Sequence, residues 1–257
     1  MKNIDELLKK VKKVHFIGIG GAGMCPLAEI LISLGYEVTG SDNNDTETFR
    51  RVEKEGAKVF PGQKKENIRA DTQLVIYTNA ILAGNEELEY AKENFPCFER
   101  AELLGAVSRV FKNCIGVCGT HGKTTTTCMI TQGLIGAELD PSAVIGGKLP
   151  LIDAYGRVGK SQNFVCESCE FNNTFLHMNP DMAVVLNVDE DHLDFFKNLD
   201  NIKKSFRKFC ESATHTVIYN GDDENTVDML KGIEGKKLIS YGINESNDYY
   251  AKNIDVP

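Results

Sequence analysis

The segment GTHGKTTTT, residues 119–127, constrains the fold of this chain more than any other, because it joins the apolar run NCIGVC to a helix-like stretch. Glycines let backbone amides close around phosphate oxygens, and a helix that begins directly after them adds its positive dipole end. In such a loop a lysine neutralises phosphate charge and a hydroxyl group binds Mg²⁺. We therefore expect a strand, a phosphate-binding loop and a helix, with Lys123 and Thr124 in these two roles.

The loop departs from the general phosphate-loop pattern at one position. That pattern places a glycine where this chain has Val117, and the glycines that flank the loop are Gly116 and Gly119 instead. An ordinary glycine-containing turn with a surface lysine is the alternative. Four consecutive threonines after Gly-Lys, next to an apolar strand, favour the nucleotide site.

Length and charge limit the class of protein. The chain has 257 residues, enough for two domains, and a formal net charge of -8 with a pI near 5.3. An acidic balance disfavours nucleic acid and anionic membrane surfaces as partners. No apolar run reaches the length of a membrane span, and the first residues form a charged amphipathic stretch, so we expect a cytoplasmic protein without membrane insertion.

The eight cysteines are expected to be reduced. Cys114, Cys118 and Cys166 lie inside apolar strand-like runs, where a free cysteine behaves as a small hydrophobic residue. Cys166 and Cys169 form a C-x-x-C pair, but residues three apart on a strand point to opposite faces, and a second such pair is lacking. Metal or redox chemistry at this pair is therefore the weaker interpretation.

Strand-like and helix-like segments alternate along the chain, which predicts βαβ units and an α/β fold with mainly parallel, doubly wound sheets. The first set contains the strand-like runs VHFIGIG, YEVTGSD and LVIYTNA, and the second contains CIGVCG, NFVCESC, MAVVLNV and HTVIYNG. We expect a Rossmann-like domain at residues 1–109 and a P-loop-type ATP-binding domain at 110–257. The chain stops within further strand-like pattern, so the second domain is expected to be truncated at its C-terminus.

A glycine-rich turn, GIGGAG, follows the first of these strands at residues 18–23. It fits the dinucleotide fingerprint, with Gly18 for the tight turn, Gly20 for close approach to a pyrophosphate and Gly23 for helix packing. Asp42 ends the next strand, where an acid can bind a ribose hydroxyl. By itself the pattern suits NAD, FAD or a UDP-sugar, and a simple turn with Asp42 as a helix cap is the structural alternative.

Acidic residues gather where further strands end, and ligands of open α/β sheets bind at these carboxyl ends. Glu167 and Glu170 follow the strand NFVC, and Asp191 and His192 lie in NVDEDHLDFF after MAVVLNV. Near a phosphate loop such groups suggest Mg²⁺ ligands, although a solvated helix start explains the second cluster equally well. The stretch NGDDEN is ambiguous in the same way. Three histidines without such neighbours are expected to be structural or exposed: His15, His177 and His215.

Taken in order, these motifs resemble those of the Mur ligases. The resemblance runs over essentially the whole chain, through GIGGAGM, GSD, YTNAI with NEE, FERAELL, GTHGKTTTT, ESCEFNNTFL, LNVDEDHLDFF, NGDD and YG. The ordered set is far more specific than any one motif. GIGGAGM beside GTHGKTTTT is most similar to the branch that adds L-alanine, the first amino acid of the peptidoglycan stem, to UDP-N-acetylmuramate.

The resemblance implies two sets of ligand contacts and a metal site. The UDP-sugar would be held by Gly18, Gly20, Gly21, Gly23, Met24, Ser41, Asp42, Thr78, Asn79 and Ala80. ATP would be held by Gly119, Thr120, His121, Gly122, Lys123, Thr124 and Thr125. The catalytic residues would be Lys123, Glu170 and His192, and the Mg²⁺ ligands would be Thr124, Glu170 and His192. From its adjacency, Asp191 would orient His192 or a metal-bound water.

The implied activity is an ATP-dependent, amide-forming ligase of peptidoglycan precursor synthesis, and thus of cell wall biogenesis, cell shape and cell division. ATP phosphorylates the lactyl carboxylate of UDP-N-acetylmuramate, and the amine of L-alanine then displaces phosphate from the acyl phosphate. The protein would mainly hold two anions together and neutralise the charge that develops on the γ-phosphoryl group.

Two departures from the family pattern affect this expectation. Relatives commonly have a histidine where this chain has Gln63, so the nucleotide contact at that position is in question. Family members also continue past residue 257 into a third, C-terminal domain, which closes over ATP and which this chain lacks. We expect UDP-sugar binding, but little or no ligase turnover, from these residues alone.

Other functions remain open on the sequence. A NAD-dependent oxidoreductase would use GIGGAG and Asp42, but it leaves GTHGKTTTT unexplained. A non-catalytic UDP-sugar-binding protein shares every motif, and a murein-tripeptide-recycling ligase has similar loops. Neither the oligomeric state nor the choice among alanine, glycine and serine follows from these residues.

Overall fold

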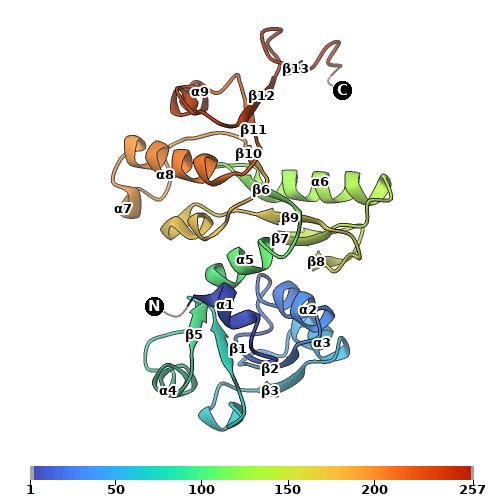
Figure 1. The fold of residues 1–257 in the computed structure, drawn as a ribbon, viewed down its shortest axis with the longest axis vertical. Helices are drawn as coiled ribbons and strands as arrows, with labels where there is room; N and C mark the ends of the chain where they lie inside the picture. Colours follow the sequence, from blue (N-terminus) through green and yellow to red (C-terminus); the bar gives the residue numbers. More distant parts are fainter. Residues whose placement is uncertain (1–2, 256–257) are drawn as a thin grey trace. The chain divides into compact units, whose positions relative to one another are not determined.

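The computed structural model describes residues 3–255. Residues 1–2 of the first expected domain and residues 256–257 of the second lie outside the described part. The chain forms two compact units. The first comprises Met1–Val107 and Ser142–Lys160, and the second comprises Ser108–Pro141 and Ser161–Pro257. The segments of each unit can be followed by colour in Figure 1.

The first unit is built on five parallel strands. They are β1 (Lys13–Ile17), β2 (Glu37–Asp42), β3 (Lys58–Pro61), β4 (Leu74–Tyr77) and β5 (Cys97–Glu99). Their order, β3-β2-β1-β4-β5, is that of a Rossmann-like sheet. Because β2 and β4 lie on opposite sides of β1, the loops that follow β1 and β4 border the crevice at which the strand order reverses.

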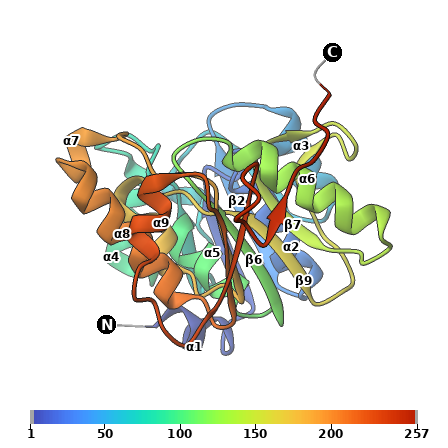
Figure 2. The same cartoon turned by 90° about the horizontal axis from the view of Figure 1, so that it is seen from above.

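Helices cover both faces of this sheet. They are α1 (Ile4–Leu8), α2 (Cys25–Ser33), α3 (Glu47–Lys54), α4 (Glu86–Asn94) and α5 (Arg100–Ser108), with the short 3-10 helix η1 (Lys65–Asn67). Figures 1 and 2 show α4 on one side of the sheet and α2 with α3 on the other. On the α4 side, Ala91 packs against Ile17 and Val75, so alternate strand residues and one helical stripe form this part of the core.

A β-hairpin also belongs to the first unit. Its strands, β7 (Ser142–Leu149) and β8 (Ala154–Arg157), pair antiparallel. A Cβ on Gly156 would lie 2.7 Å from Pro26 Cβ, so a glycine is needed where the hairpin packs on α2. Lys148 of β7 pairs with Glu47 of α3 at 3.0 Å. This hairpin was not predicted from the sequence.

In the second unit, six strands are paired in parallel in the order β13-β12-β11-β10-β6-β9. They are β6 (Asn113–Cys118), β9 (Asn163–Glu167), β10 (Met182–Val185), β11 (Thr216–Asn220), β12 (Lys237–Gly242) and β13 (Tyr249–Tyr250). β6 lies between β9 and β10, and the loops after these three strands therefore collect at one edge of the sheet.

The helices of the second unit lie on opposite sides of its strands. They are α6 (Lys123–Gly136), α7 (Leu193–Phe196), α8 (Leu199–Ser212), α9 (Glu224–Leu230) and the 3-10 helix η2 (Phe171–His177). Figures 1 and 2 both show α6 on one side and α8 on the other. Ile130 of α6 packs with Val117, whereas the neighbouring Gly116 faces Phe209 of α8, where a Cβ would lie 3.0 Å from the ring. Side chains of β6 thus alternate between the two helices.

The α/β fold class with parallel sheets, predicted from the alternating pattern, is confirmed. The seven predicted strands correspond to β1, β2, β4, β6, β9, β10 and β11. All eight cysteines are free, and those predicted to lie in apolar strands, Cys114, Cys118 and Cys166, are buried. Within residues 3–255, no helix combines the length and apolar character needed to cross a membrane.

Candidate functional site

The glycine loop after β1 is shaped by close contacts that exclude side chains. Gly18 has φ +87°, and a Cβ there would lie 2.8 Å from Thr78 Cγ2. At Gly20 a Cβ would lie 2.9 Å from Thr46 Oγ1. At the third fingerprint glycine, Gly23, a Cβ would lie 3.0 Å from the end of the flexible Arg100 side chain, which is a looser restriction. The loop therefore packs closely against neighbouring segments on several sides.

Asp42 and Ser41 at the end of β2 hold this loop in place. The Asp42 carboxylate accepts hydrogen bonds from Gly20 N at 2.9 Å and from Asn44 N at 3.0 Å. The Ser41 carbonyl oxygen accepts from Gly18 N at 2.8 Å and from Ile19 N at 3.0 Å. Asp42 thus fastens the loop through its side chain, a role that neither the ribose-binding nor the helix-cap interpretation of the sequence included.

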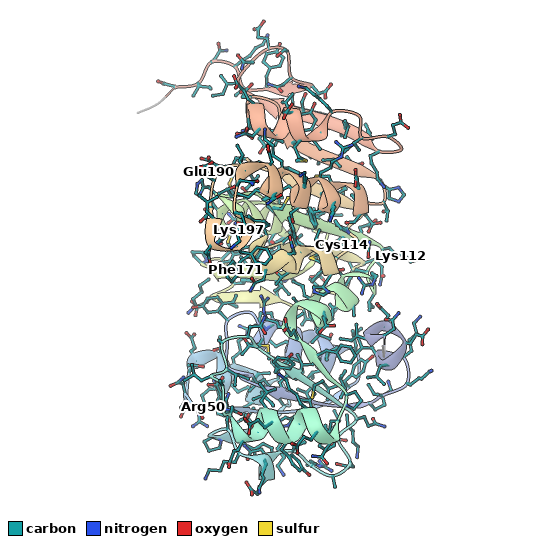
Figure 3. All side chains as sticks on the ribbon, turned by 90° about the vertical axis from the view of Figure 1, so that its left-hand side faces the viewer. Arg50, Lys112, Cys114, Phe171, Glu190 and Lys197 are labelled. Carbon is teal, nitrogen blue, oxygen red and sulfur yellow. The ribbon has the colours of Figure 1, made fainter. Side chains whose placement is uncertain are left out.

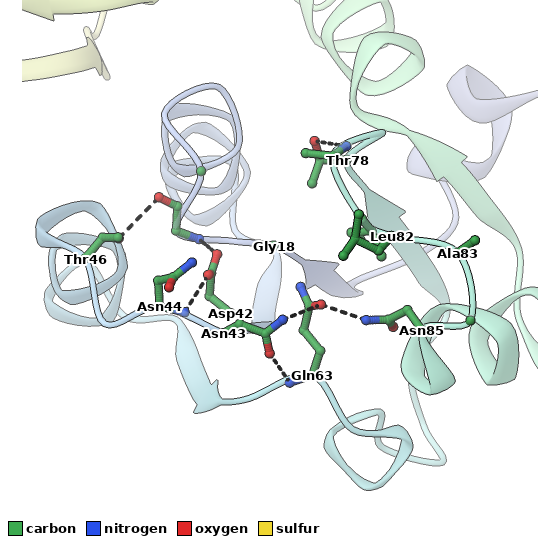
Figure 4. A pocket seen from close by; sticks show the side chains of 15 residues that line it. Gly18, Asp42, Asn43, Asn44, Thr46, Gln63, Thr78, Leu82, Ala83 and Asn85 are labelled. Carbon is green, nitrogen blue, oxygen red and sulfur yellow. Dashed lines mark hydrogen bonds between the residues drawn. The ribbon is translucent and has the colours of Figure 1, made fainter.

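A cavity of about 560 Å³ opens beside the glycine loop. Its walls come from the loops after β1, β2, β3 and β4, and Figure 4 shows the lining side chains. Gln63 lies between two walls, because its Oε1 accepts hydrogen bonds from Asn43 Nδ2 at 3.1 Å and from Asn85 Nδ2 at 2.7 Å. The volume is in the range typical of small-molecule sites, and glycine amides with an asparagine-rich rim suit a polar nucleotide.

The structure brings most of the predicted UDP-sugar residues together at this cavity. Six of them line it: Gly18, Gly20, Gly21, Asp42, Thr78 and Ala80. Four are placed differently. Ser41 and Met24 are buried, Gly23 packs against Arg100, and Asn79 donates a hydrogen bond to Glu99 at 2.9 Å. Residues that the sequence analysis had not proposed as UDP-sugar contacts also line the cavity, among them Asn43, Asn85 and Leu82.

In the second unit, the loop between β6 and α6 is built as a phosphate loop. Gly119 has φ +150°, and a Cβ there would lie 2.9 Å from Leu186 Cβ. Gly122 has φ +84° and is the N-cap of α6, and no described side chain caps this helix. The first amides of an uncapped helix have no partner within the helix and carry its positive dipole end. Those of Lys123, Thr124 and Thr125 can therefore bind phosphate oxygens.

Two further loop amides are engaged by Asn187, which follows β10. Thr120 N donates to Asn187 O at 3.1 Å, and His121 N donates to Asn187 Oδ1 at 2.8 Å. Asp189 N donates to Thr120 Oγ1 at 2.9 Å. Thr120 and His121 therefore fix the loop to the segment that leads to His192. Asn187 lay within the motif LNVDEDHLDFF, but its role was not apparent from the sequence.

Lys123 and Glu170 form an ion pair at this loop. Lys123 Nζ lies 3.0 Å from Glu170 Oε1 and 2.9 Å from Oε2, and it also donates to Gly119 O at 2.6 Å and to Thr120 O at 3.1 Å. The Glu170 side chain is 3% exposed, and its Oε2 makes no well-aligned hydrogen bond to any described residue. A buried carboxylate oxygen in this state is suited to a cation as an additional partner.

Thr124 faces Glu167 rather than Glu170. Thr124 Oγ1 donates to Glu167 Oε2 at 2.8 Å, and Glu167 is the last residue of β9. A threonine hydroxyl and a carboxylate oxygen are donors of the kind that Mg²⁺ prefers. The residues present therefore fit a magnesium ion between the phosphate loop and β9.

Glu170, Asp191 and His192 form a second group of potential metal ligands, whose ligand atoms all lie within 4.8 Å of one another. His192 Nε2 lies 4.0 Å from Glu170 Oε1, and His192 Nδ1 lies 3.8 Å from Asp191 Oδ1. His192 has φ +49°, and its ring contacts Phe171 with centroids 4.7 Å apart. The predicted residues Lys123, Glu170 and His192 are thus brought together, with Asp191 beside them.

The loops that carry these groups lie at the carboxyl edge of the sheet. Figure 3 shows Phe171 and Glu190 on one side of the second unit, and Lys112 and Cys114, at the start of β6, on the opposite side. By contrast, the motif NGDDEN is structural. Asp222 accepts hydrogen bonds from Asn244 and Asn247 at 2.7 and 2.9 Å, and Asp223 accepts one from Thr226 N at 2.8 Å and caps α9.

Together, a Rossmann-like unit with a nucleotide-sized cavity and an α/β unit with a phosphate loop define a two-part nucleotide-binding protein. Residues 13–112 match the model for the Mur ligase family catalytic domain, and residues 117–256 match the model for the Mur ligase middle domain. The chain belongs to the Mur ligase family.

Similar proteins agree with this placement. The UDP-N-acetylmuramate--L-alanine ligase of Caldanaerobacter subterraneus is 47% identical over 251 residues, which cover 96% of this chain and 54% of that protein. The structure of UDP-N-acetylmuramate-alanine ligase MurC from Thermotoga maritima is similar with a TM-score of 0.78 and 28% identity, over 91% of this chain and 53% of that one. The structure of the UDP-N-acetylmuramate:L-alanyl-gamma-D-glutamyl-meso-diaminopimelate ligase from Neisseria meningitides is similar with a TM-score of 0.81 and 26% identity, over 92% of this chain and 79% of that one. This chain therefore spans about half the length of the curated relative.

Proposed function

We propose that this chain is the nucleotide-binding part of an ATP-dependent ligase that joins L-alanine to the lactyl carboxylate of UDP-N-acetylmuramate. The pairing of Lys123 with Glu170 beside Thr124 with Glu167 carries this proposal, because it assembles a charge-neutralising lysine and oxygen ligands at one phosphate loop. A relative with 47% identity bears the name of this activity. An oxidoreductase is discarded, since the phosphate loop falls within the matched middle domain.

Each unit has a separate task in the proposed reaction. We assign the UDP-sugar to the first unit and ATP to the second, with Gly18 and Asp42 near the UDP pyrophosphate and uridine. Lys123 and the first amides of α6 hold the phosphates of ATP. The lactyl carboxylate attacks the γ-phosphorus and ADP leaves. The amine of L-alanine then attacks the acyl phosphate, phosphate leaves, and an amide forms.

Mg²⁺ bound by Thr124 and Glu167, and a second ion near Glu170 and His192, would neutralise the charge on the transferred phosphoryl group. The protein residues orient these ligands. Lys123 fixes the Glu170 carboxylate, and Asp191 lies beside His192 Nδ1. ATP and a nucleotide-sugar are metabolites of the cytoplasm, so the reaction is placed there.

Binding and turnover test this proposal separately. Calorimetry with UDP-N-acetylmuramate and with ATP–Mg²⁺ is expected to show saturable binding of each to this chain. Phosphate release with ATP, Mg²⁺, UDP-N-acetylmuramate and L-alanine is expected from a version extended to the length of the relatives, because domain closure completes such sites. Failure of the extended version to turn over, with both ligands bound, would favour a non-catalytic UDP-sugar-binding protein.

A ligase that attaches a tripeptide is the second candidate, because a structure with that name has a TM-score of 0.81 to this chain. The same phosphate assay distinguishes the two. We expect L-alanine to support turnover of the extended version and L-alanyl-γ-D-glutamyl-meso-diaminopimelate to leave the rate at background. The reverse preference would assign the chain to the second candidate.

A further inference from the structure

A buried polar network lies beneath the cavity of the first unit. His15 of β1, Thr39 and Ser41 of β2, and Glu87 of α4 are all buried, and His15, Ser41 and Glu87 are 0% exposed. Glu87 Oε1 lies 3.0 Å from His15 Nε2, and Glu87 Oε2 accepts a hydrogen bond from Ser41 Oγ at 2.5 Å. His15 Nδ1 lies 2.7 Å from Thr39 Oγ1. Both carboxylate oxygens and both ring nitrogens are therefore satisfied.

Glu87 occupies a position that normally suits an apolar residue. It lies one helical turn before Ala91, which packs in the apolar core against Ile17 and Val75. Removing a carboxylate from water is costly, and a hydrophobic residue of similar volume often serves stability as well or better. Stability of the core is thus a weak explanation for a glutamate here. The groups that are hydrogen-bonded to Glu87 suggest a different explanation.

Ser41 connects Glu87 to the glycine loop. The Ser41 hydroxyl donates to Glu87, while its carbonyl oxygen accepts hydrogen bonds from Gly18 N and Ile19 N. Any shift of Ser41 is therefore transmitted to the first residues of the loop that borders the cavity.

Glu87 also fixes the opposite wall of the cavity through its own helix. Asn85, two residues before it, is the N-cap of α4, with Oδ1 accepting from Leu88 N at 2.9 Å. The same side chain donates through Nδ2 to Gln63 Oε1 at 2.7 Å, and both residues line the cavity. One buried carboxylate thus connects the glycine-loop wall to the wall formed by Asn85 and Gln63.

We propose that Glu87 is a positioning residue for UDP-N-acetylmuramate, setting the separation of the two cavity walls without touching the ligand. This inference rests on the proposed function of the first unit. Ser41, expected from the family resemblance to contact the UDP-sugar, acts in this proposal through the same network, because its side chain is buried and bonded to Glu87.

The test compares Glu87→Gln with Glu86→Gln on the full 257-residue chain. The first variant keeps the side-chain volume but removes a charged acceptor, and the second makes the same change at an exposed position in the same helical turn. UDP-N-acetylmuramate and ATP–Mg²⁺ are titrated by calorimetry. We expect Glu87→Gln to raise the Kd for UDP-N-acetylmuramate about tenfold, which corresponds to about 1.4 kcal/mol, because hydrogen bonds to a charged acceptor are lost. The Kd for ATP should stay within about twofold, and Glu86→Gln should change neither.

Ser41→Ala provides a second variant that depends less on how the core accepts a glutamine. It too is expected to weaken UDP-N-acetylmuramate binding, and the double variant Ser41→Ala/Glu87→Gln should bind no more weakly than the weaker single variant, because both remove the same connection.

The outcomes separate the inference from the proposed function. If wild-type protein binds UDP-N-acetylmuramate, and both Glu87→Gln and Ser41→Ala bind it equally well, the positioning role is overturned and the proposed function stands. A lowered Tm with unchanged Kd has the same meaning, because it indicates a purely structural network. If the wild-type protein fails to bind UDP-N-acetylmuramate, the proposed function falls and this inference with it.

Discussion

The Thr124 hydroxyl donates a hydrogen bond to Glu167 at 2.8 Å, while Lys123, one residue earlier, pairs with Glu170 at 2.9 Å. Two consecutive residues at the start of α6 therefore bind two different carboxylates, which lie three positions apart in the segment CESCE. Glu167 ends β9, and Glu170 precedes the 3-10 helix η2. Glu167 therefore lies beside the Thr124 hydroxyl, where we propose a metal ion, and Glu170 lies beside the lysine.

Glu167→Gln is expected to weaken binding of ATP–Mg²⁺ at least about tenfold, because an ionised oxygen donor beside Thr124 is lost; even outer-sphere partners of metals often contribute 10-fold or more. Binding of ATP in EDTA should be little changed. Calorimetry with and without Mg²⁺ measures the difference, with the exposed Glu234→Gln as a control. Equal loss of affinity under both conditions would contradict a metal-binding role for Glu167.

Lys123→Met should lower ATP affinity by roughly 10- to 100-fold through the lost contact with phosphate. It should also lower the Tm, since it leaves Glu170, 3% exposed, without its cation. The double variant Lys123→Met/Glu170→Gln is expected to recover the Tm but not the ATP affinity. Differential scanning fluorimetry and calorimetry measure the two effects, and recovery of both together would show that Lys123 has only a structural role.

Gly18→Ala and Gly35→Ala form a matched pair for the glycine loop. Both residues have similar left-handed φ values, +87° and +83°, so each alanine should cost about 1–2 kcal/mol of unfolding free energy. A Cβ on Gly18 would also lie 2.8 Å from Thr78 Cγ2, whereas nothing lies within 4 Å at Gly35. Denaturant unfolding should therefore show a greater loss for Gly18→Ala. Gly18→Ala should also weaken UDP-N-acetylmuramate binding, and unaltered binding would argue against this cavity as the site.

The buried Cys210 and the half-buried Cys97 lead us to expect a loss of stability at alkaline pH. Burial raises the pKa of Cys210 to about 12 and that of Cys97 to about 11, from 9.0. Above pH 9 the unfolded chain releases these protons while the folded chain retains them, so the free energy of unfolding falls as pH rises towards the folded pKa values. Denaturant titrations at pH 8 and pH 10 measure the change.

Cys210→Ala should reduce this pH dependence, because its thiol no longer contributes, although it will lower stability at both pH values through the cavity it leaves. An unfolding free energy that is the same at pH 8 and pH 10 would contradict the raised pKa values of these thiols in the folded protein.

The fold could be predicted from the sequence because its physical basis is local. Apolar runs bounded by Gly18 and Gly119 predicted two strands that end in ligand-binding turns, and the structure has β1 and β6 there. Lys123, Glu170 and His192 were predicted as one group, and they lie together because each follows a neighbouring parallel strand or its loop. The hairpin of β7 and β8 was missed, since no helix separates its two strands to reveal the alternation.

The sequence by itself determined the glycine-rich loop, the phosphate loop, the parallel α/β architecture and the family. It could do so because the conformation of glycines and the alternation of strands with helices are properties of short segments. The tertiary structure decided which carboxylate faces Thr124, that Ser41 is bonded to Glu87 instead of lining the cavity, and that Asn187 engages the phosphate-loop amides. These pairings depend on where each strand ends and on which face its last side chains lie. These pairings form only when segments distant in the sequence pack together. In the sequence alone, two glutamates such as Glu167 and Glu170 cannot be told apart, because the neighbours that distinguish them come from other segments.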